Sequence, residues 1–164
     1  SVSASRALGG GALLELSHEL DYLFWLFGDL DLKHSWLRTT DELCLDVEEI
    51  ANLVLVSAAE DIYITLNLDF IQKYPQRTCE IVAEHGRISW DLANHEVVMS
   101  GRDGIELLYS DEEYDHNDMY IQMLKEFESE SMENSLYLAN LNSSCDVIRV
   151  IERAKQTNQW ERKA

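Results

Sequence analysis

Four polar or aromatic side chains near the N-terminus have the spacing needed to line a pocket together. Glu15 and His18 are three residues apart, and Tyr22 and Trp25 follow at spacings of four and three. At about 100° per residue all four share one helix face. A separate apolar stripe is formed by Leu13, Leu16, Leu20, Leu23, Phe24 and Phe27. The second face therefore predicts a pocket wall, with a solvated Glu15–His18 pair and an aromatic core contact as the alternative.

Three consecutive glycines, Gly9 to Gly11, open this predicted helix. Glycine permits unusual backbone angles and the close approach of a ligand or another backbone segment. The run is not a dinucleotide-binding fingerprint, because such a loop follows a strand, whereas small polar residues precede this one. We therefore expect no cofactor-binding residue in this chain.

The run GGGALLELSHELDYLFWLFG, residues 9–28, resembles the helix that opens the C-terminal domain of the Gfo/Idh/MocA oxidoreductases. The resemblance continues through DVEEIAN (46–52), CEIVAEHGRI (79–88) and DMY (118–120), in the family's order. The usual motif is an acid, then a glycine, then a histidine. This chain has Glu15 for the more frequent aspartate, and Ser17 rather than glycine directly before His18.

The resemblance implies an enzyme of two domains. Residues 1–164 would form a single domain for substrate and oligomer contacts, and the N-terminal dinucleotide-binding domain would lie outside them. The implied reaction moves a hydride between NAD or NADP and the hydroxyl carbon of a sugar, sugar derivative or polyol. His18 would bind the reacting hydroxyl and exchange its proton, while Glu15 would orient His18 or hold a neighbouring hydroxyl. Because the cofactor would be bound mainly by the other domain, we expect the chain alone to be inactive.

The charge balance argues against a nucleic-acid partner. The net charge is −18, with 13 basic residues scattered among 31 acidic ones, whereas a nucleic-acid binder needs clustered Lys and Arg. A phosphorylated substrate also needs a basic focus, and Lys73 with Arg77 is the best available pair. No apolar run approaches the ~20 residues that span a bilayer, so we expect no membrane contact. Three scattered cysteines without a Cys-x-x-Cys motif favour reduced thiols in a cytoplasmic compartment.

Short alternating segments follow the first helix and predict strands. The close spacing of the later ones favours antiparallel hairpins. Helical spacing returns near His116 and from about Cys145 to Gln156, where Ser143 and Asp146 have capping-box spacing. The fold class expected is α+β, with a largely antiparallel open sheet of about six strands and helices packed on one face. The strands are expected at 32–40, 50–57, 62–70, 78–83, 87–92, 96–99 and 105–109.

The other face of the sheet is expected to be available for oligomerisation. Ile50 to Ser57 is apolar on both faces, with Val54 and Val56 on one and Leu53 and Leu55 on the other. Only one face can pack on the chain's own helices. The apolar residues of the second face therefore predict an interface with another copy of the chain, and so a homo-oligomer.

Two further functions stay open. A non-catalytic oligomerisation or ligand-binding module would need only the sheet face. A metal-dependent enzyme is suggested by two Glu-x-x-His pairs, Glu15 with His18 and Glu113 with His116, as in di-iron bundles. Such bundles need four long helices, whereas the middle of this chain has the pattern of strands. We therefore assign no metal ligand.

Overall fold

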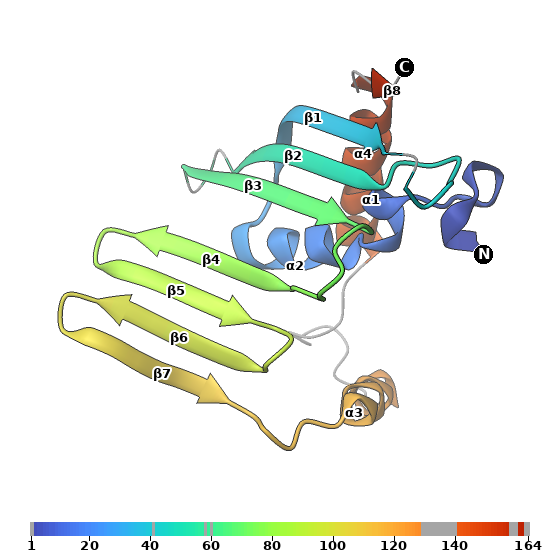
Figure 1. The fold of residues 1–164 in the computed structure, drawn as a ribbon. Coiled ribbons are helices and arrows are strands. Elements are labelled where there is room, and N and C mark those ends of the chain that lie inside the picture. The colour runs from blue at the N-terminus through green and yellow to red at the C-terminus, as the bar shows by residue number, and fades with distance from the viewer. Residues whose placement is uncertain are drawn as a thin grey trace. The chain divides into compact units, whose positions relative to one another are not determined.

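The computed structural model describes residues 2–40, 42–57, 59, 61–128, 141–157 and 161–162. The chain divides into two compact units (Figure 1). The first contains residues 1–71 and 139–164, and the second contains residues 72–138.

The first unit is built on a four-stranded sheet in the order β3-β2-β1-β8. Strands β1 (Asp31–Thr39), β2 (Ile50–Ser57) and β3 (Ile62–Asp69) are antiparallel, and the short β8 (Glu161–Arg162) pairs in parallel with β1. The β2–β3 register runs without a shift from Ile50↔Asp69 to Ser57↔Ile62, whereas β1 is irregular between Leu32 and His34.

Helices cover one face of this sheet. They are α1 (Ala12–Glu15), α2 (His18–Phe27) and α4 (Leu141–Thr157), preceded by the 3₁₀ turns η1 (Val2–Ala4) and η2 (Arg6–Leu8). The buried face of α4 is the predicted one: Val147, Val150, Ile151 and Ala154. The helix begins at Leu141, so Ser143 lies inside it, and the predicted capping position of Ser143 is wrong.

The predicted first helix is interrupted at Leu16 and Ser17. Leu16 has φ −99° and ψ 25°, outside the helical region, and the N–H of Ser17 donates to the carbonyl of Leu14 in a tighter, 3₁₀-like turn. A new helix then begins at His18. The expected single helix is therefore two short helices.

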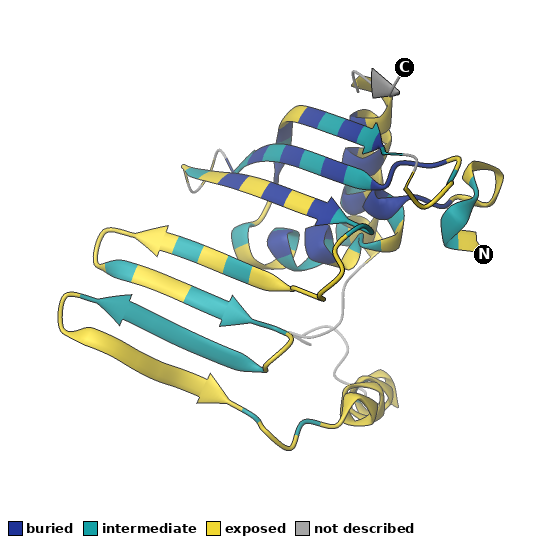
Figure 2. Cartoon of the chain, viewed as in Figure 1, coloured by how far each residue is buried: buried dark blue, intermediate teal, exposed yellow. Residues whose placement is uncertain are grey.

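The core lies between the helices and the inner sheet face. Along β2, Ala51, Leu53 and Leu55 are buried, while Val54 and Val56 are only half-buried on the opposite face (Figure 2). This is the alternation predicted from the sequence. Each fully buried leucine contributes about 1.5–3 kcal/mol relative to an exposed one.

The second unit is a meander of four antiparallel strands followed by a helix. The strands are β4 (Thr78–Ala83), β5 (Gly86–Asp91), β6 (Glu96–Gly101) and β7 (Gly104–Ser110), paired in chain order, and α3 spans His116–Glu128. The Asp91 carboxylate accepts hydrogen bonds from the backbone N–H groups of Ala93 and Asn94. This contact closes the β5–β6 turn.

The α+β class with open antiparallel sheets is confirmed, but the strands form two sheets rather than one. β3 and β4 belong to different sheets, and residues 70–77 between them carry no strand. That segment contains Pro75, which has no N–H to give to a ladder. Within the described ranges, no helix is long and apolar enough to cross a membrane.

Candidate functional site

The glycine triplet fits tightly against two other segments of the first unit. A Cβ on Gly10 would lie 2.5 Å from the carbonyl oxygen of Ser3. Gly11 has φ 118° and ψ 152°, a conformation essentially restricted to glycine, and faces the Glu48 carboxylate. The triplet therefore serves close packing at the entrance of α1.

The Glu48 carboxylate occupies the N-terminus of α1. Its Oε1 accepts a hydrogen bond from the N–H of Leu13 at 3.3 Å and lies 3.6 Å from Nζ of Lys155. Its backbone carbonyl accepts from the N–H of Ala12 at 3.0 Å. The side chain is buried, so these contacts tie the start of α1, the helix that carries Glu15, to the segment before β2 and to α4.

His18 is the first residue of α2, and its charged partner is Glu19. Nε2 of His18 lies 3.1 Å from Oε1 of Glu19. The His18 side chain is 50% exposed, whereas that of Glu19 is 10% exposed. No hydrogen bond or ion pair joins Glu15 to His18 within the described residues.

Sequence reasoning missed Glu19, although a signal for its burial was present. Glu19 is adjacent to Leu20 and lies four residues before Leu23, and both leucines belong to the apolar stripe. In a helix, a carboxylate at this position lies at the edge of the buried face. Glu19 is indeed buried beside these two core leucines of α2.

The remaining candidates are divided between the two units. Tyr22 is half-buried against the core of the first unit, and Trp25 on the same helix is 65% exposed. Lys73 and Arg77 are exposed in the segment before β4, in the second unit. The carbonyl of Arg77 accepts a hydrogen bond from the N–H of Leu92, which fixes the start of that unit.

Glu49, beside Glu48, is a fully buried carboxylate with a structural role. The pKa of the Glu49 carboxyl is lowered overall. Burial alone would raise it, but hydrogen bonds from the hydroxyl and N–H of Thr40 and from the N–H of Leu43 stabilise the ionised form more strongly. The ionised carboxylate thus holds the loop between β1 and β2.

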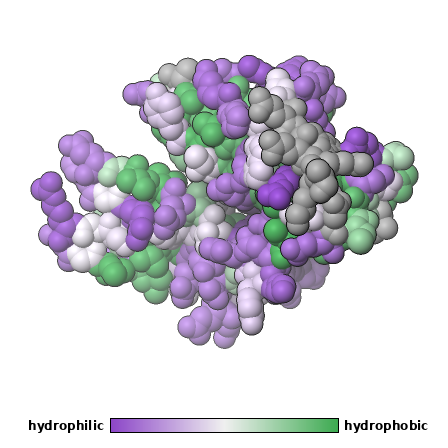
Figure 3. Space-filling view, turned by 45° about the horizontal axis from the view of Figure 1, so that its top comes forward, coloured by the Kyte–Doolittle hydropathy of each residue, from purple (hydrophilic) through white to green (hydrophobic). Residues whose placement is uncertain are grey.

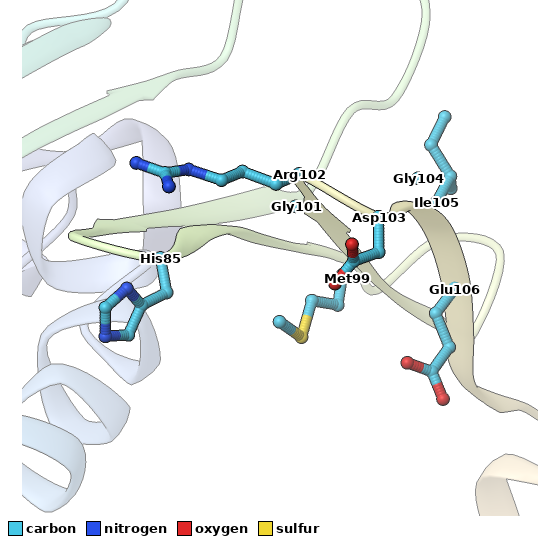
Figure 4. Close-up of a pocket in the computed structure, with 8 residues that line it drawn as sticks. All are labelled: His85, Met99, Gly101, Arg102, Asp103, Gly104, Ile105 and Glu106. Atoms are coloured by element: carbon cyan, nitrogen blue, oxygen red, sulfur yellow. The ribbon is translucent and has the colours of Figure 1, made fainter.

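Two surface hollows lie apart from the candidate residues. One, of about 390 Å³, lies in the second unit, where His85 comes from the β4–β5 turn and Arg102 and Asp103 from the β6–β7 turn (Figure 4). The other, of about 320 Å³, lies in the first unit between α2, β1 and α4. Neither hollow is lined by any of the six predicted site residues.

The metal hypothesis finds no support among the described residues, where no three His, Cys, Asp or Glu side chains gather as a metal site. The two Glu-x-x-His pairs lie in different units. His116 stacks edge-on against Tyr114, with ring centroids 5.3 Å apart.

The visible surface in Figure 3 is largely hydrophilic, in keeping with the net charge of −18.

Comparison with known protein families identifies the class of domain to which this chain belongs. The sequence profile described as "Oxidoreductase family, C-terminal alpha/beta domain" matches residues 3–162. The chain therefore belongs to the Gfo/Idh/MocA oxidoreductase family, as its C-terminal domain. A comparison with curated proteins gives no match.

Solved structures with the same fold include three enzymes. KijD10, a 3-ketoreductase from Actinomadura kijaniata in complex with NADP and TDP-benzene, has a TM-score of 0.71 and 17% identity, covering 100% of this chain and 51% of that one. UDP-N-acetylglucosamine 3-dehydrogenase GnnA from Acidithiobacillus ferrooxidans has a TM-score of 0.64 and 15% identity, covering 88% and 45%. D-galactose-1-dehydrogenase from Rhizobium etli has a TM-score of 0.66 and 13% identity, covering 98% and 47%. The chain thus spans about half the length of these relatives.

Proposed function

We propose that this chain is the substrate-binding domain of an oxidoreductase that acts on a hydroxyl group of a sugar, sugar derivative or polyol with NAD or NADP. The observation that carries the proposal is His18, an imidazole half open to solvent beside a buried carboxylate. The resemblance of residues 9–28 to the family's opening helix makes His18 the counterpart of the family's histidine. Two of the similar structures are sugar dehydrogenases and a third is a ketoreductase, which supports this substrate class.

The described residues of this chain do not fit the cofactor's pyrophosphate. In the described ranges, Gly9 to Gly11 is the only glycine-rich segment directly before a helix. That helix, α1, has just four residues. The buried Glu48 carboxylate already occupies that helix end and would repel a phosphate. The cofactor is therefore assigned to a dinucleotide-binding domain outside this chain.

Each candidate residue has a defined task in this proposal. His18 binds the reacting hydroxyl and exchanges its proton, and Glu15, exposed at the end of α1, holds a neighbouring hydroxyl. Tyr22 and Trp25 lie on the same side of α2 as His18, and their aromatic rings can pack against a sugar ring. Lys73 and Arg77 supply the positive charge needed for a phosphorylated substrate.

A substrate panel tests this assignment. The complete protein that contains this domain is incubated with NAD or NADP and with free sugars, polyols and nucleotide-linked sugars. Absorbance of the reduced nicotinamide reports turnover. We expect turnover with at least one of these classes and its loss in His18→Ala, whereas turnover that His18→Ala leaves unchanged would refute the role of His18.

We also propose that the open face of the β1–β3 sheet joins two copies of the chain. Val54 and Val56 are half-buried there, and Tyr63, opposite Val56, is 77% exposed. The helices cover the other face, so an apolar sheet surface is left for a partner, and symmetric dimers are the commonest oligomers.

A further inference from the structure

The candidate catalytic histidine has a carboxylate beside it that the motif does not supply. The acid of the motif corresponds to Glu15, which precedes His18 by three residues in this chain. The structure instead places Oε1 of Glu19 at 3.1 Å from Nε2 of His18. The charged contact of His18 is therefore with the next residue along the chain.

This contact lies directly after the interruption between α1 and α2. Adjacent residues do not face each other in the middle of a helix. His18 and Glu19 are the first two residues of α2, and the Glu19 N–H donates to the carbonyl of Leu16, before the helix starts. The contact is thus one between neighbouring side chains in the first turn of α2.

The Glu19 carboxylate is well placed to hold the imidazole still. Its side chain is 10% exposed, against 50% for that of His18, so Glu19 is the buried member of the pair and His18 the exposed one. Burial restricts its rotamers, and the positive end of the α2 dipole favours an anion in the first turn. The Glu19 carboxylate is thus held in place while the His18 imidazole faces the solvent.

We propose that Glu19 is the positioning residue of His18, an inference that rests on the proposed function. A carboxylate beside Nε2 favours a proton on that nitrogen and leaves the lone pair on Nδ1. In the oxidation direction the substrate hydroxyl proton passes to Nδ1, and the carboxylate stabilises the imidazolium that forms. The nicotinamide, held by the other domain, would accept the hydride from the carbon that bears this hydroxyl. Glu15 has no part in orienting the ring.

Single and double variants of the complete protein test this role. Glu19→Gln keeps the size of the side chain and removes its charge, and should lower kcat by about 10- to 100-fold with little change in KM, because a misplaced catalytic group loses rate at this scale. Glu15→Gln is the matched control, since it removes the motif's acid and should act on KM. Glu19→Asp keeps the charge and should recover part of the lost kcat.

The double variant separates positioning from a general effect on the fold. In a His18→Ala background, Glu19→Gln should lower turnover no further, because the residue that it positions is gone. An additive loss in the double variant, or normal kcat in Glu19→Gln, would overturn the inference. Normal turnover in His18→Ala would instead refute the catalytic role proposed for His18, and no turnover with any substrate class would refute the proposed function, so the failures are distinct. Thermal unfolding of each variant confirms that rates refer to folded protein.

Discussion

Gly11 and the carboxylate of Glu48 share one space at the entrance of α1. A Cβ built on Gly11 would lie 2.5 Å from Cδ of Glu48, well inside the contact distance of two carbon atoms. Glu48 comes from the segment before β2, whereas Gly11 precedes the helices that carry Glu15 and His18. The absence of a side chain at Gly11 therefore lets a distant carboxylate secure the start of the candidate site.

We predict that Gly11→Ala destabilises the domain more than Gly28→Ala. Both glycines have positive φ and extended ψ, a conformation that costs another residue about 1–3 kcal/mol. Gly28 has open space around its Cβ position, whereas Gly11 meets Glu48, which adds about 1–3 kcal/mol of overpacking. Urea unfolding of both variants measures the difference. Equal losses would show that Glu48 does not restrict Gly11, and a Glu48→Ala background should reduce the excess.

The buried Glu49 should make stability depend on acid pH. Its pKa is lowered in the fold because the hydrogen bonds from Thr40 and Leu43 outweigh burial. A lowered folded-state pKa stabilises the fold above the unfolded pKa, and this contribution is lost as pH falls through the lowered value. We expect Glu49→Gln to cost about 1–3 kcal/mol at neutral pH, the scale of disrupted buried hydrogen bonds.

The loss should shrink as pH falls below about 4.3, the ordinary pKa of glutamate. Thermal unfolding as a function of pH checks this, with Glu152→Gln on the exposed side of α4 as the control. A constant penalty from neutral to acid pH would contradict the role of the ionised carboxylate.

The proposed dimer face is tested by a charge on the sheet. Val54→Glu places a carboxylate on the open face of β2, opposite Thr65, and two copies would bring such charges together. We expect sedimentation to show a dimer for the unchanged chain and a monomer for Val54→Glu. Ile148→Glu on the exposed side of α4 should leave the dimer intact. A monomeric unchanged chain at high micromolar concentration would refute this interface.

Lys73 and Arg77 should matter only for substrates that carry phosphate. Both are exposed in the segment before β4, and a hydrogen bond to a charged group is worth about 1.5–3 kcal/mol. Lys73→Ala with Arg77→Ala should therefore raise KM for a nucleotide-linked sugar by about 10-fold or more. Arg102→Ala, also an exposed arginine of the second unit, is the control. An equal rise for a free sugar would refute a phosphate-specific role.

The sequence predicted those elements whose patterns are set locally. β2 keeps its predicted ends, and α4 buries the predicted residues, because alternation and helical spacing respond directly to burial. The interruption at Leu16 and Ser17 carries no proline or glycine, and its one residue-type signal is Ser17, because serine is favoured at helix N-termini. The helix-wheel alignment of Glu15 with His18 assumed a continuous helix and considered residues three and four apart, so it did not include the contact of His18 with its neighbour Glu19. The separation into two sheets depends on which strand edges pair, which periodicity does not specify.

These 164 residues alone should not bind the cofactor tightly. The Glu48 carboxylate fills the N-terminus of α1, and a pyrophosphate there would face a buried anion. We therefore expect isothermal titration calorimetry of the isolated chain with NAD and NADP to show no tight binding. The complete protein, measured in the same buffer, is the positive control. Tight binding by the isolated chain would refute both the assignment of the cofactor to another domain and the structural role given to Glu48.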